Sequence, residues 1–197
     1  MKVGIIGAGA IGTTIAKHLT EAGYNVIISN SRGADTLGEK IKEIRGNTVA
    51  GSVQEAAEAD VVFLAVRWEH AQEAISAVNL EGKILVDVTN AGLPEFVRAE
   101  PGSKTSSEVV SQWAKGAKVV KAFNTLYANV LAKNPQVADG NRVIFYSGND
   151  QDSKDVVSGI INTIGFAGID LGTLHEGGKL QRFPGGPLPT LNLIRTK

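Results

Sequence analysis

The chain contains no cysteine, which excludes disulfide bonds, cysteine nucleophiles and cysteine-ligated zinc or iron–sulfur centres. It has only three histidines, and His18, His70 and His175 do not have the spacing of metal ligands, so we expect no metal site. An excess of either charge is also missing, because Lys plus Arg and Asp plus Glu number 20 each. The sequence therefore gives no electrostatic basis for binding nucleic acid or an anionic membrane.

Long apolar runs are absent too. No segment approaches the roughly 18 apolar residues that a membrane span requires. The N-terminal stretch is interrupted by Thr13, Lys17 and His18, so it lacks the apolar core of a secretory signal. A length of 197 residues suits one domain, or one domain with a small appendage. We expect a cytoplasmic protein that binds no membrane.

What the chain does have is a glycine-rich turn at its start. An apolar strand runs into the pattern G-x-G-x-x-G, formed by Gly7, Gly9 and Gly12, and a helical pattern follows. In a dinucleotide-binding unit the first glycine permits the tight turn, the second lets the backbone approach the pyrophosphate, and the third lets the helix pack on the strand. The phosphates would then bind the N–H groups at the start of the helix, at Ala10 and Ile11.

The segment after the second predicted strand, Asn25–Ser29, indicates which dinucleotide binds. NAD sites place an Asp or Glu there for the ribose hydroxyls, whereas NADP sites supply a cation for the 2′-phosphate. This chain has Ser31 and Arg32 at that position, and its first carboxylate, Asp35, lies beyond the turn. A hydroxyl and a planar guanidinium suit phosphate oxygens, so we expect NADP(H). The alternative is a polar loop with a solvated arginine.

Strands and helices continue to alternate along the chain. The continuous apolar run Asp60–Val66 is typical of a central parallel strand that is covered on both faces, and Lys83–Val88 and Lys118–Phe123 predict two more strands. Helices are expected over residues 10–22, 37–44, 53–57, 69–78 and 106–115, and Ser52 is expected to cap the third of them. This order predicts an α/β fold with a doubly wound, Rossmann-type parallel sheet.

The pattern changes in the last third of the chain. Strands are expected at Arg142–Ser147 and Ala167–Leu171, with a helix over residues 150–164 between them. The remainder is expected to be loop-rich, except for a short terminal helix at Leu188–Ile194. We therefore predict an NADP-binding Rossmann domain at residues 1–135. A small α+β extension at residues 136–197 would complete an acceptor pocket.

In an open α/β sheet, ligands bind at the carboxyl ends of the strands. The loops after the fourth and fifth strands should thus border the cofactor, and the residues expected to do so are Ala65, Val66, Arg67 and Asn90. The loop after the sixth strand should line the acceptor pocket beside the nicotinamide. There Asn124 offers a donor and an acceptor and is the candidate for a direct role in catalysis. Leu126 would form an apolar wall, and Tyr127 would lie against a planar ring.

These motifs resemble the deazaflavin-dependent NADP reductases, in which NADP exchanges hydride with coenzyme F-420. The likeness is carried by the glycine motif, the Ser-Arg pair, Trp68-Glu69-His70-Ala71 and Leu191-Asn192-Leu193. The segment Val120-Lys121-Ala122-Phe123-Asn124-Thr125 is similar to bacterial dinucleotide-binding oxidoreductases and to the cytosolic domain of the STEAP metalloreductases, which uses NADPH and a flavin. The resemblance extends over nearly the whole chain.

The resemblance implies particular site residues. Ser31 and Arg32 would be ligands of the 2′-phosphate, and Leu126 and Ala128 would be walls of the acceptor pocket. The deazaflavin reductases have His at the position of Asn124, and they have Pro where Arg67 and Tyr127 stand. The NADP-binding half of the pattern is therefore retained, whereas the residues beside the acceptor differ.

Hydride transfer between a nicotinamide and a flavin-like ring needs two stacked rings and no protein acid or base. The first hypothesis is therefore an NADP(H)-dependent oxidoreductase that transfers hydride between NADPH and a small-molecule acceptor, either a flavin or a deazaflavin such as coenzyme F-420. Two alternatives stay open: a dehydrogenase or reductase of a small carbonyl or imine substrate, and an NADP(H)-binding sensor without turnover. The apolar tail at Leu188–Ile194 also predicts a homodimer in which the tail helps to close the pocket.

Overall fold

The structure is a computed structural model that describes residues 1–92 and 103–196. Within these ranges ten strands form one sheet in the order β10-β8-β6-β5-β4-β1-β2-β3, and β7 and β9 also pair with β8. The strands are β1 (Lys2–Ile6), β2 (Asn25–Ser29), β3 (Thr48–Ala50), β4 (Val61–Leu64), β5 (Ile84–Asp87), β6 (Lys118–Ala122), β7 (Gln136–Val137), β8 (Gly140–Gly148), β9 (Ala167–Asp170) and β10 (Ile194–Thr196).

The first six strands carry the fold that the sequence predicts. They are all parallel and lie in the order 3-2-1-4-5-6, which is the order of the Rossmann-type, doubly wound fold. The strand order reverses between β1 and β4, and dinucleotides bind in the crevice at that point. The prediction of a parallel Rossmann sheet is therefore confirmed for this part of the chain.

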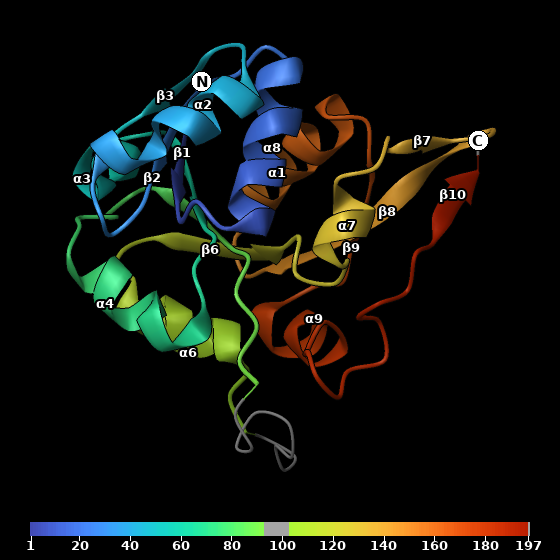
Figure 1. The fold of residues 1–197 in the computed structure, drawn as a ribbon. Coiled ribbons are helices and arrows are strands. Elements are labelled where there is room, and N and C mark those ends of the chain that lie inside the picture. The colour runs from blue at the N-terminus through green and yellow to red at the C-terminus, as the bar shows by residue number, and fades with distance from the viewer. Residues whose placement is uncertain (93–102, 197) are drawn as a thin grey trace.

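Helices cover both faces of the sheet (Figure 1). The described helical segments are α1 (Ala10–Glu21), η1 (Ala34–Leu37), α2 (Gly38–Ile44), α3 (Val53–Ala57), η2 (Trp68–His70), α4 (Ala71–Ser76), α6 (Ser106–Trp113), α7 (Ala128–Leu131), α8 (Gln151–Thr163) and α9 (Leu174–Leu180). Helices α1 and α8 lie on one face, and α4, α6 and α9 lie on the other.

The two larger hydrophobic cores follow from the alternation of side chains along each strand. In β4, Val61 and Phe63 belong to the core beneath α1 and α8, whereas Val62 and Leu64 belong to the core beneath α3, α4, α6 and α9. All four side chains are buried. A strand that is buried on both faces reads as a continuous apolar run, which explains why this strand could be predicted from the sequence.

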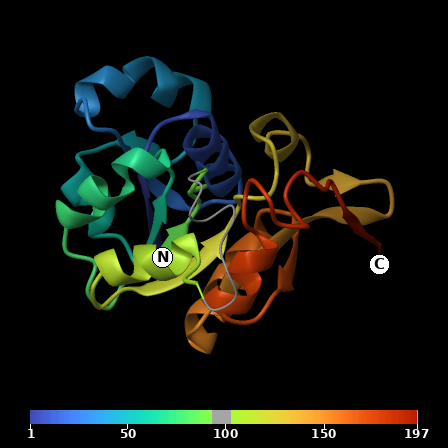
Figure 2. The same cartoon turned by 90° about the horizontal axis from the view of Figure 1, so that it is seen from below.

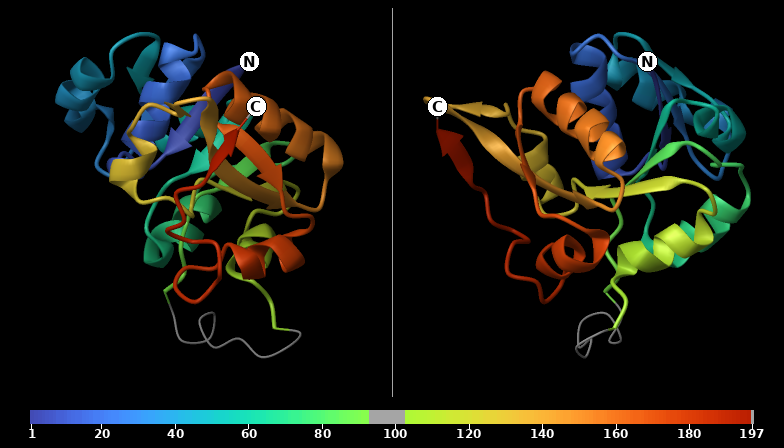
Figure 3. Two further views of the ribbon diagram at one scale, coloured as in Figure 1. Left: turned by 90° about the vertical axis from the view of Figure 1, so that its right-hand side faces the viewer. Right: turned by 180° about the vertical axis from the view of Figure 1, so that it is seen from behind.

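The sheet continues into the last third of the chain. Strand β8 pairs antiparallel with β6, and β9 pairs parallel with β8, so the complete sheet is mixed. The outermost strand, β10, lies at the opposite edge from β3 (Figure 2), and Figure 3 shows β7, β8 and β10 extending to that side. Hydrogen bonds of the sheet thus connect the two proposed units, residues 1–135 and 136–197. The division of the chain into these two units, with a boundary after residue 135, remains a proposal.

The tail differs from its predicted structure. The prediction of a helix at Leu188–Ile194 is wrong, because this segment is non-helical. It ends at the first residue of β10, Ile194, which pairs with Arg142 of β8. Pro187 and Pro189 disfavour a helix there, and the edge of β8 offers backbone groups for pairing. A helix forms earlier instead, since Thr173 caps α9 by accepting a hydrogen bond from the Glu176 amide.

Candidate functional site

The glycine turn between β1 and α1 shows three different reasons for its three glycines. Gly7 has a φ of 115°, and a Cβ there would lie 2.3 Å from the carbonyl oxygen of Ala65. A Cβ at Gly12 would lie 2.0 Å from the carbonyl oxygen of Gly7, so the helix could not pack so close to the turn. A Cβ at Gly9 would meet nothing within 4 Å. Gly9 therefore borders open space, as a residue beneath a pyrophosphate should.

Helix α1 begins at this turn with its N-terminus exposed to a ligand. Gly9 is the N-cap residue; in the described structure no side chain caps the helix and no acidic residue stands in its first turn. The amides of Ala10 and Ile11 therefore belong to the group of N–H donors that a helix start leaves for water or a ligand. Together with the helix dipole they favour an anion at this position.

A cleft of about 700 Å³ opens at the carboxyl ends of β1, β2 and β4. The predicted cofactor residues that line it are Gly7, Gly9, Ser31, Arg32, Ala65, Val66 and Arg67. The predicted residues Ala10, Ile11, Gly12 and Asn90 are not part of its lining. The first three form the start of α1, and Asn90 lies farther along the sheet, after β5.

Sequence reasoning missed one wall of the cleft. The lining also includes Asn30, Val53, His70, Glu73, Ala74 and Ala77. Four of these, at positions 70, 73, 74 and 77, have the i, i+3, i+4, i+7 spacing of one helical face and lie along η2 and α4. This spacing is present in the sequence and could have indicated the cleft-facing side of the helix. The apolar pattern of the neighbouring face, which packs on the sheet, is the stronger of the two.

The loop after β2 is held by its own side chains. Asn30 Oδ1 accepts a hydrogen bond from the Arg32 amide at 2.9 Å, and Asn30 Nδ2 donates to Thr36 Oγ1 at 2.9 Å. These bonds form a local turn of the kind that Asn favours. Both Ser31 and Arg32 are exposed and line the cleft. The two residues predicted to bind the 2′-phosphate thus stand on the same wall.

Arg67 supplies a second cation to the cleft. Its Nε lies 3.2 Å from Glu69 Oε1, and its Nη2 lies 3.4 Å from His70 Nε2. The Arg67 side chain is 78% exposed, so the ion pair is screened by water and holds the guanidinium weakly. By contrast, the adjacent Trp68 packs against Trp113, with ring centroids 5.1 Å apart, and is not part of the lining.

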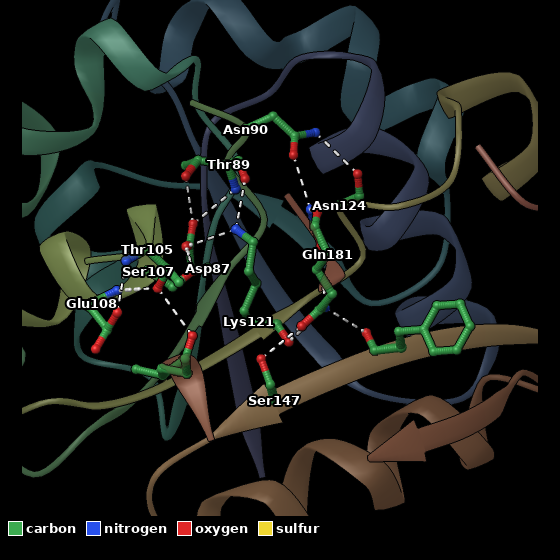
Figure 4. Close-up of polar contacts among 12 residues, drawn as sticks. Asp87, Thr89, Asn90, Thr105, Ser107, Glu108, Lys121, Asn124, Ser147 and Gln181 are labelled. Atoms are coloured by element: carbon green, nitrogen blue, oxygen red, sulfur yellow. Dashed lines mark hydrogen bonds and ion pairs between the residues drawn. The ribbon is translucent and has the colours of Figure 1, made fainter. Parts of the chain in front are cut away.

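The carboxyl ends of β5 and β6 carry buried polar groups instead. Asn124 is buried, and its Nδ2 donates to Asn90 Oδ1 at 2.9 Å, while Asn90 Nδ2 donates to the Asn124 carbonyl at 3.1 Å (Figure 4). The preceding residue, Phe123, has a φ of 64°, which costs a bulky residue about 1–3 kcal/mol. This sharp turn brings Asn124 beside Asn90. The proposed role of Asn124 in catalysis would require its amide to exchange partners.

The other predicted acceptor residues differ in exposure. Leu126 is only 6% exposed and belongs to the larger hydrophobic core, Tyr127 is 56% exposed, and Ala128 is partly buried. Only Tyr127 therefore offers a large surface to a ligand. An acceptor pocket at the loop after β6 therefore remains a prediction.

A buried ion pair lies behind these loops. Lys121 Nζ is 3.2 Å from Asp87 Oδ2 and donates to the Thr89 carbonyl at 3.0 Å. Asp87 Oδ1 accepts from the Thr89 amide at 2.9 Å and from Thr89 Oγ1 at 2.6 Å, and Asp87 Oδ2 accepts from the Ser107 hydroxyl. Both charged side chains are almost fully buried and have several partners, as buried charges require. The network fixes the loop that leads from β5 to Asn90 (Figure 4).

One carboxylate beside this network has a perturbed pKa. Glu108 forms a capping box with Thr105 at the start of α6 and also lies 3.1 Å from His175 Nδ1. Burial is the largest influence and raises the pKa of Glu108. The hydrogen bonds from Thr105 and His175 together outweigh it, so the pKa of Glu108 is lowered.

Two further structural observations concern metals and membranes. In the part of the chain that the structure describes, no three His, Asp or Glu side chains gather in a way that could hold a metal ion. Over the same residues, none of the helices has the length and apolar character needed to cross a membrane.

Comparison with known proteins shows which family the N-terminal part of the chain resembles. Residues 2–91 match the family model described as "NADP oxidoreductase coenzyme F420-dependent". The matched residues include the glycine turn, the Ser-Arg loop and the wall formed by α4. This part of the chain is similar to that family of NADP-dependent oxidoreductases, as the motifs suggested, and the expected cofactor, NADP(H), agrees with the match.

Similar proteins extend the match over nearly the whole chain. A hypothetical protein from Sinorhizobium meliloti is 42% identical with a TM-score of 0.90, over 99% of this chain and 96% of that one. A chain from Arthrobacter sp. fb24, assigned as an f420 dependent nadp-reductase, is 27% identical with a TM-score of 0.72, over 88% of this chain and 86% of that one.

The curated relatives are longer. Metalloreductase STEAP3 from Rattus norvegicus is 31% identical over 192 residues, which are 96% of this chain and 37% of that protein. The chain thus spans about a third of the length of the curated relatives that it matches.

Proposed function

We propose that the chain binds NADP(H) across the carboxyl edge of its sheet and transfers hydride between the nicotinamide and a small planar acceptor. The observation that carries this proposal is the cleft in which the glycine turn and the pair Ser31–Arg32 face the same space. The pyrophosphate binds the start of α1 beside Gly9. The 2′-phosphate accepts hydrogen bonds from the Ser31 hydroxyl and the Arg32 guanidinium.

The adenine lies against the wall of the cleft that η2, α4 and Val53 of α3 form. Val53, Ala74 and Ala77 give that wall small apolar surfaces, which suit a flat base. Arg67 stands beside this wall and can turn toward a phosphate, because its partners are exposed. The nicotinamide then extends along the edge of the sheet toward the ends of β5 and β6.

The acceptor is a flavin or a deazaflavin. When bound, the two cofactors supply the hydride chemistry themselves. The protein orients the rings and excludes water, and no acid or base of the chain is needed. Tyr127 is the exposed aromatic side chain of the loop after β6 and lies against the acceptor ring. Asn124 and Asn90 hold the loops that border the nicotinamide.

A panel of acceptors tests this function. NADPH oxidation is followed by stopped-flow absorbance with a free flavin, a deazaflavin, a cyclic imine and a small ketone as acceptors. We expect reduction of a flavin or deazaflavin only. Reduction of the imine or ketone alone would favour a carbonyl or imine reductase. NADPH binding without reduction of any acceptor would favour a sensor.

We also propose a homodimer. Large apolar side chains remain exposed on the tail and near the acceptor loop, among them Phe183, Leu191 and Leu193 at 37%, 41% and 42% exposure. A second copy would cover them and help to close the acceptor pocket from water. Sedimentation at micromolar concentration tests the assembly, and a monomer there would contradict it.

A further inference from the structure

Helix α9 is packed unusually close to its neighbours. A Cβ at Gly177 would lie 2.3 Å from Ser147 Cβ, and one at Gly178 would lie 2.9 Å from Thr105 Oγ1. Only glycine therefore permits this approach of α9 to β8 and to the start of α6. The close contact places Gln181, the C-cap residue of the helix, beneath the sheet.

Gln181 has no exposed surface, and its side chain is bonded at both ends. Its Oε1 accepts from Ser147 Oγ at 2.7 Å, and its Nε2 donates to the Phe145 carbonyl at 3.1 Å and to Asn124 Oδ1 at 3.3 Å. Its main-chain carbonyl also accepts from Asn124 Nδ2 at 2.7 Å. Two contacts thus connect the end of α9 to Asn124 (Figure 4).

The connection continues to the loop after β5. Asn124 and Asn90 exchange hydrogen bonds in both directions, and the loop that carries Asn90 is fixed from behind by Lys121 and Asp87. Residues that are distant in the sequence, from β5, β6 and α9, therefore form one buried polar network. A satisfied buried network of this kind holds its members in one arrangement.

We propose that Gln181 is a positioning residue, which fixes through Asn124 and Asn90 the wall against which the nicotinamide ring rests. Helix α9 then sets the orientation of that ring for hydride transfer. The inference rests on the proposed function, which puts the nicotinamide at the ends of β5 and β6. Orientation matters because a displacement of about 1 Å can slow such a reaction about 100-fold.

Gln181→Met tests the proposal, since methionine retains the length and apolar volume while removing both polar ends. Two quantities are measured on NADPH alone: the dissociation constant, and the fluorescence lifetime of the bound nicotinamide, which lengthens when the ring is held. We expect the dissociation constant to change less than about twofold, because the adenosine cleft lies on other strands. We expect the lifetime to fall toward that of NADPH in solution, and flavin reduction to slow at least tenfold.

Asn141→Ala is the matched control. Asn141 lies on the same strand as Ser147, and its partly buried amide donates to the Gly165 carbonyl at 2.6 Å, remote from the loops after β5 and β6. This variant loses one partly buried hydrogen bond, yet it should retain the wild-type lifetime. If Gln181→Met does not fold, Ser147→Ala replaces it; this milder change removes one partner of Gln181 and should shorten the lifetime in part.

The outcomes separate this inference from the proposed function. An unchanged lifetime in the Gln181 variant, or an equal loss in Asn141→Ala, overturns the positioning role alone. NADPH binding by the wild type without reduction of any acceptor overturns the reductase proposal, while the lifetime still tests Gln181. Failure of the wild type to bind NADPH overturns both.

Discussion

At the ends of β1, β2 and β4 the candidate ligand groups are exposed side chains on loops, whereas at the ends of β5 and β6 the polar side chains are buried or partly buried and are bonded to one another. Arg32 and Arg67 belong to the first region, and the buried Asn124 and Lys121 and the partly buried Asn90 belong to the second. Exposed cations can reorient toward a phosphate and bind it through charge-assisted hydrogen bonds. Buried networks contribute a fixed geometry instead.

The two regions therefore have different roles along one edge of the sheet. The adenosine half of the cofactor provides binding energy, and the nicotinamide half requires precise placement. Substitutions in the first region should therefore weaken binding, and substitutions in the second should slow transfer at unchanged affinity.

The largest effect is expected at the glycine turn. Gly9→Val places a branched side chain in the open space that the pyrophosphate would occupy, so NADPH affinity should fall more than about 100-fold. The fold should survive, because the new side chain meets no protein atom within 4 Å of its Cβ. Isothermal titration and circular dichroism measure the two properties.

Gly159→Val is the matched control for this change. Gly159 lies in α8, and a Cβ there would also meet nothing within 4 Å. The variant should gain a little helix stability, because valine has a higher helix propensity than glycine, and should bind NADPH as the wild type does. Tight binding by Gly9→Val would show that the turn does not hold the pyrophosphate.

Arg32→Ala should have the next largest effect. A hydrogen bond to a charged group contributes about 1.5–3 kcal/mol. NADPH binding should therefore weaken about ten- to a hundredfold, while NADH, which lacks the 2′-phosphate, should be barely affected. Arg67→Ala, whose guanidinium already has partners in Glu69 and His70, should weaken NADPH binding less. Equal losses for both cofactors in the Arg32 variant would contradict the assignment to NADP.

Tyr127→Arg probes the opposite region. The exposed Tyr127 stands where the acceptor is proposed to lie, and its replacement removes the aromatic face against which the acceptor ring would pack. We expect flavin reduction to slow about tenfold, because the acceptor ring is held less precisely, with the affinity for NADPH unchanged. Leu126→Arg would be a poorer probe, because Leu126 is buried in the core and its replacement would destabilise the fold. If the Tyr127 variant reduces the flavin at the wild-type rate, the acceptor binds at another place.

The same contrast explains what the sequence could predict. The adenosine region depends on local patterns, such as the spacing of Gly7, Gly9 and Gly12 and the pair Ser31–Arg32, and the structure brings most of these residues to one cleft. The prediction of buried strands such as β4 also depends on a local pattern, a continuous apolar run. The network around Gln181 joins positions that are 57 residues apart in the chain, and no local pattern signals such a contact. The tail was mispredicted for a related reason, since its pairing with β8 is a long-range contact.

The smallest effect is expected in the pH dependence of stability. Glu108 is the N3 residue of the capping box that Thr105 begins at α6, and it follows Ser107, a partner of Asp87 in the buried network. Its pKa is lowered in the folded protein: burial acts against this, but the hydrogen bonds from Thr105 and His175 prevail. A lowered pKa means that the unfolded chain binds more protons in acid. The stabilisation is therefore complete above the unfolded pKa of about 4.3 and is lost as the pH falls through the lower folded value.

Glu108→Gln should remove this contribution, which is less than about 1 kcal/mol because the side chain is partly exposed. Denaturant unfolding between pH 3 and pH 7 compares the two proteins. Their difference in free energy of unfolding should be greatest near neutral pH and should shrink in acid. A difference that is constant over this range would mean that the charge of Glu108 does not stabilise the start of α6. NADPH affinity should be unchanged in the variant throughout, because α6 lies outside the adenosine cleft.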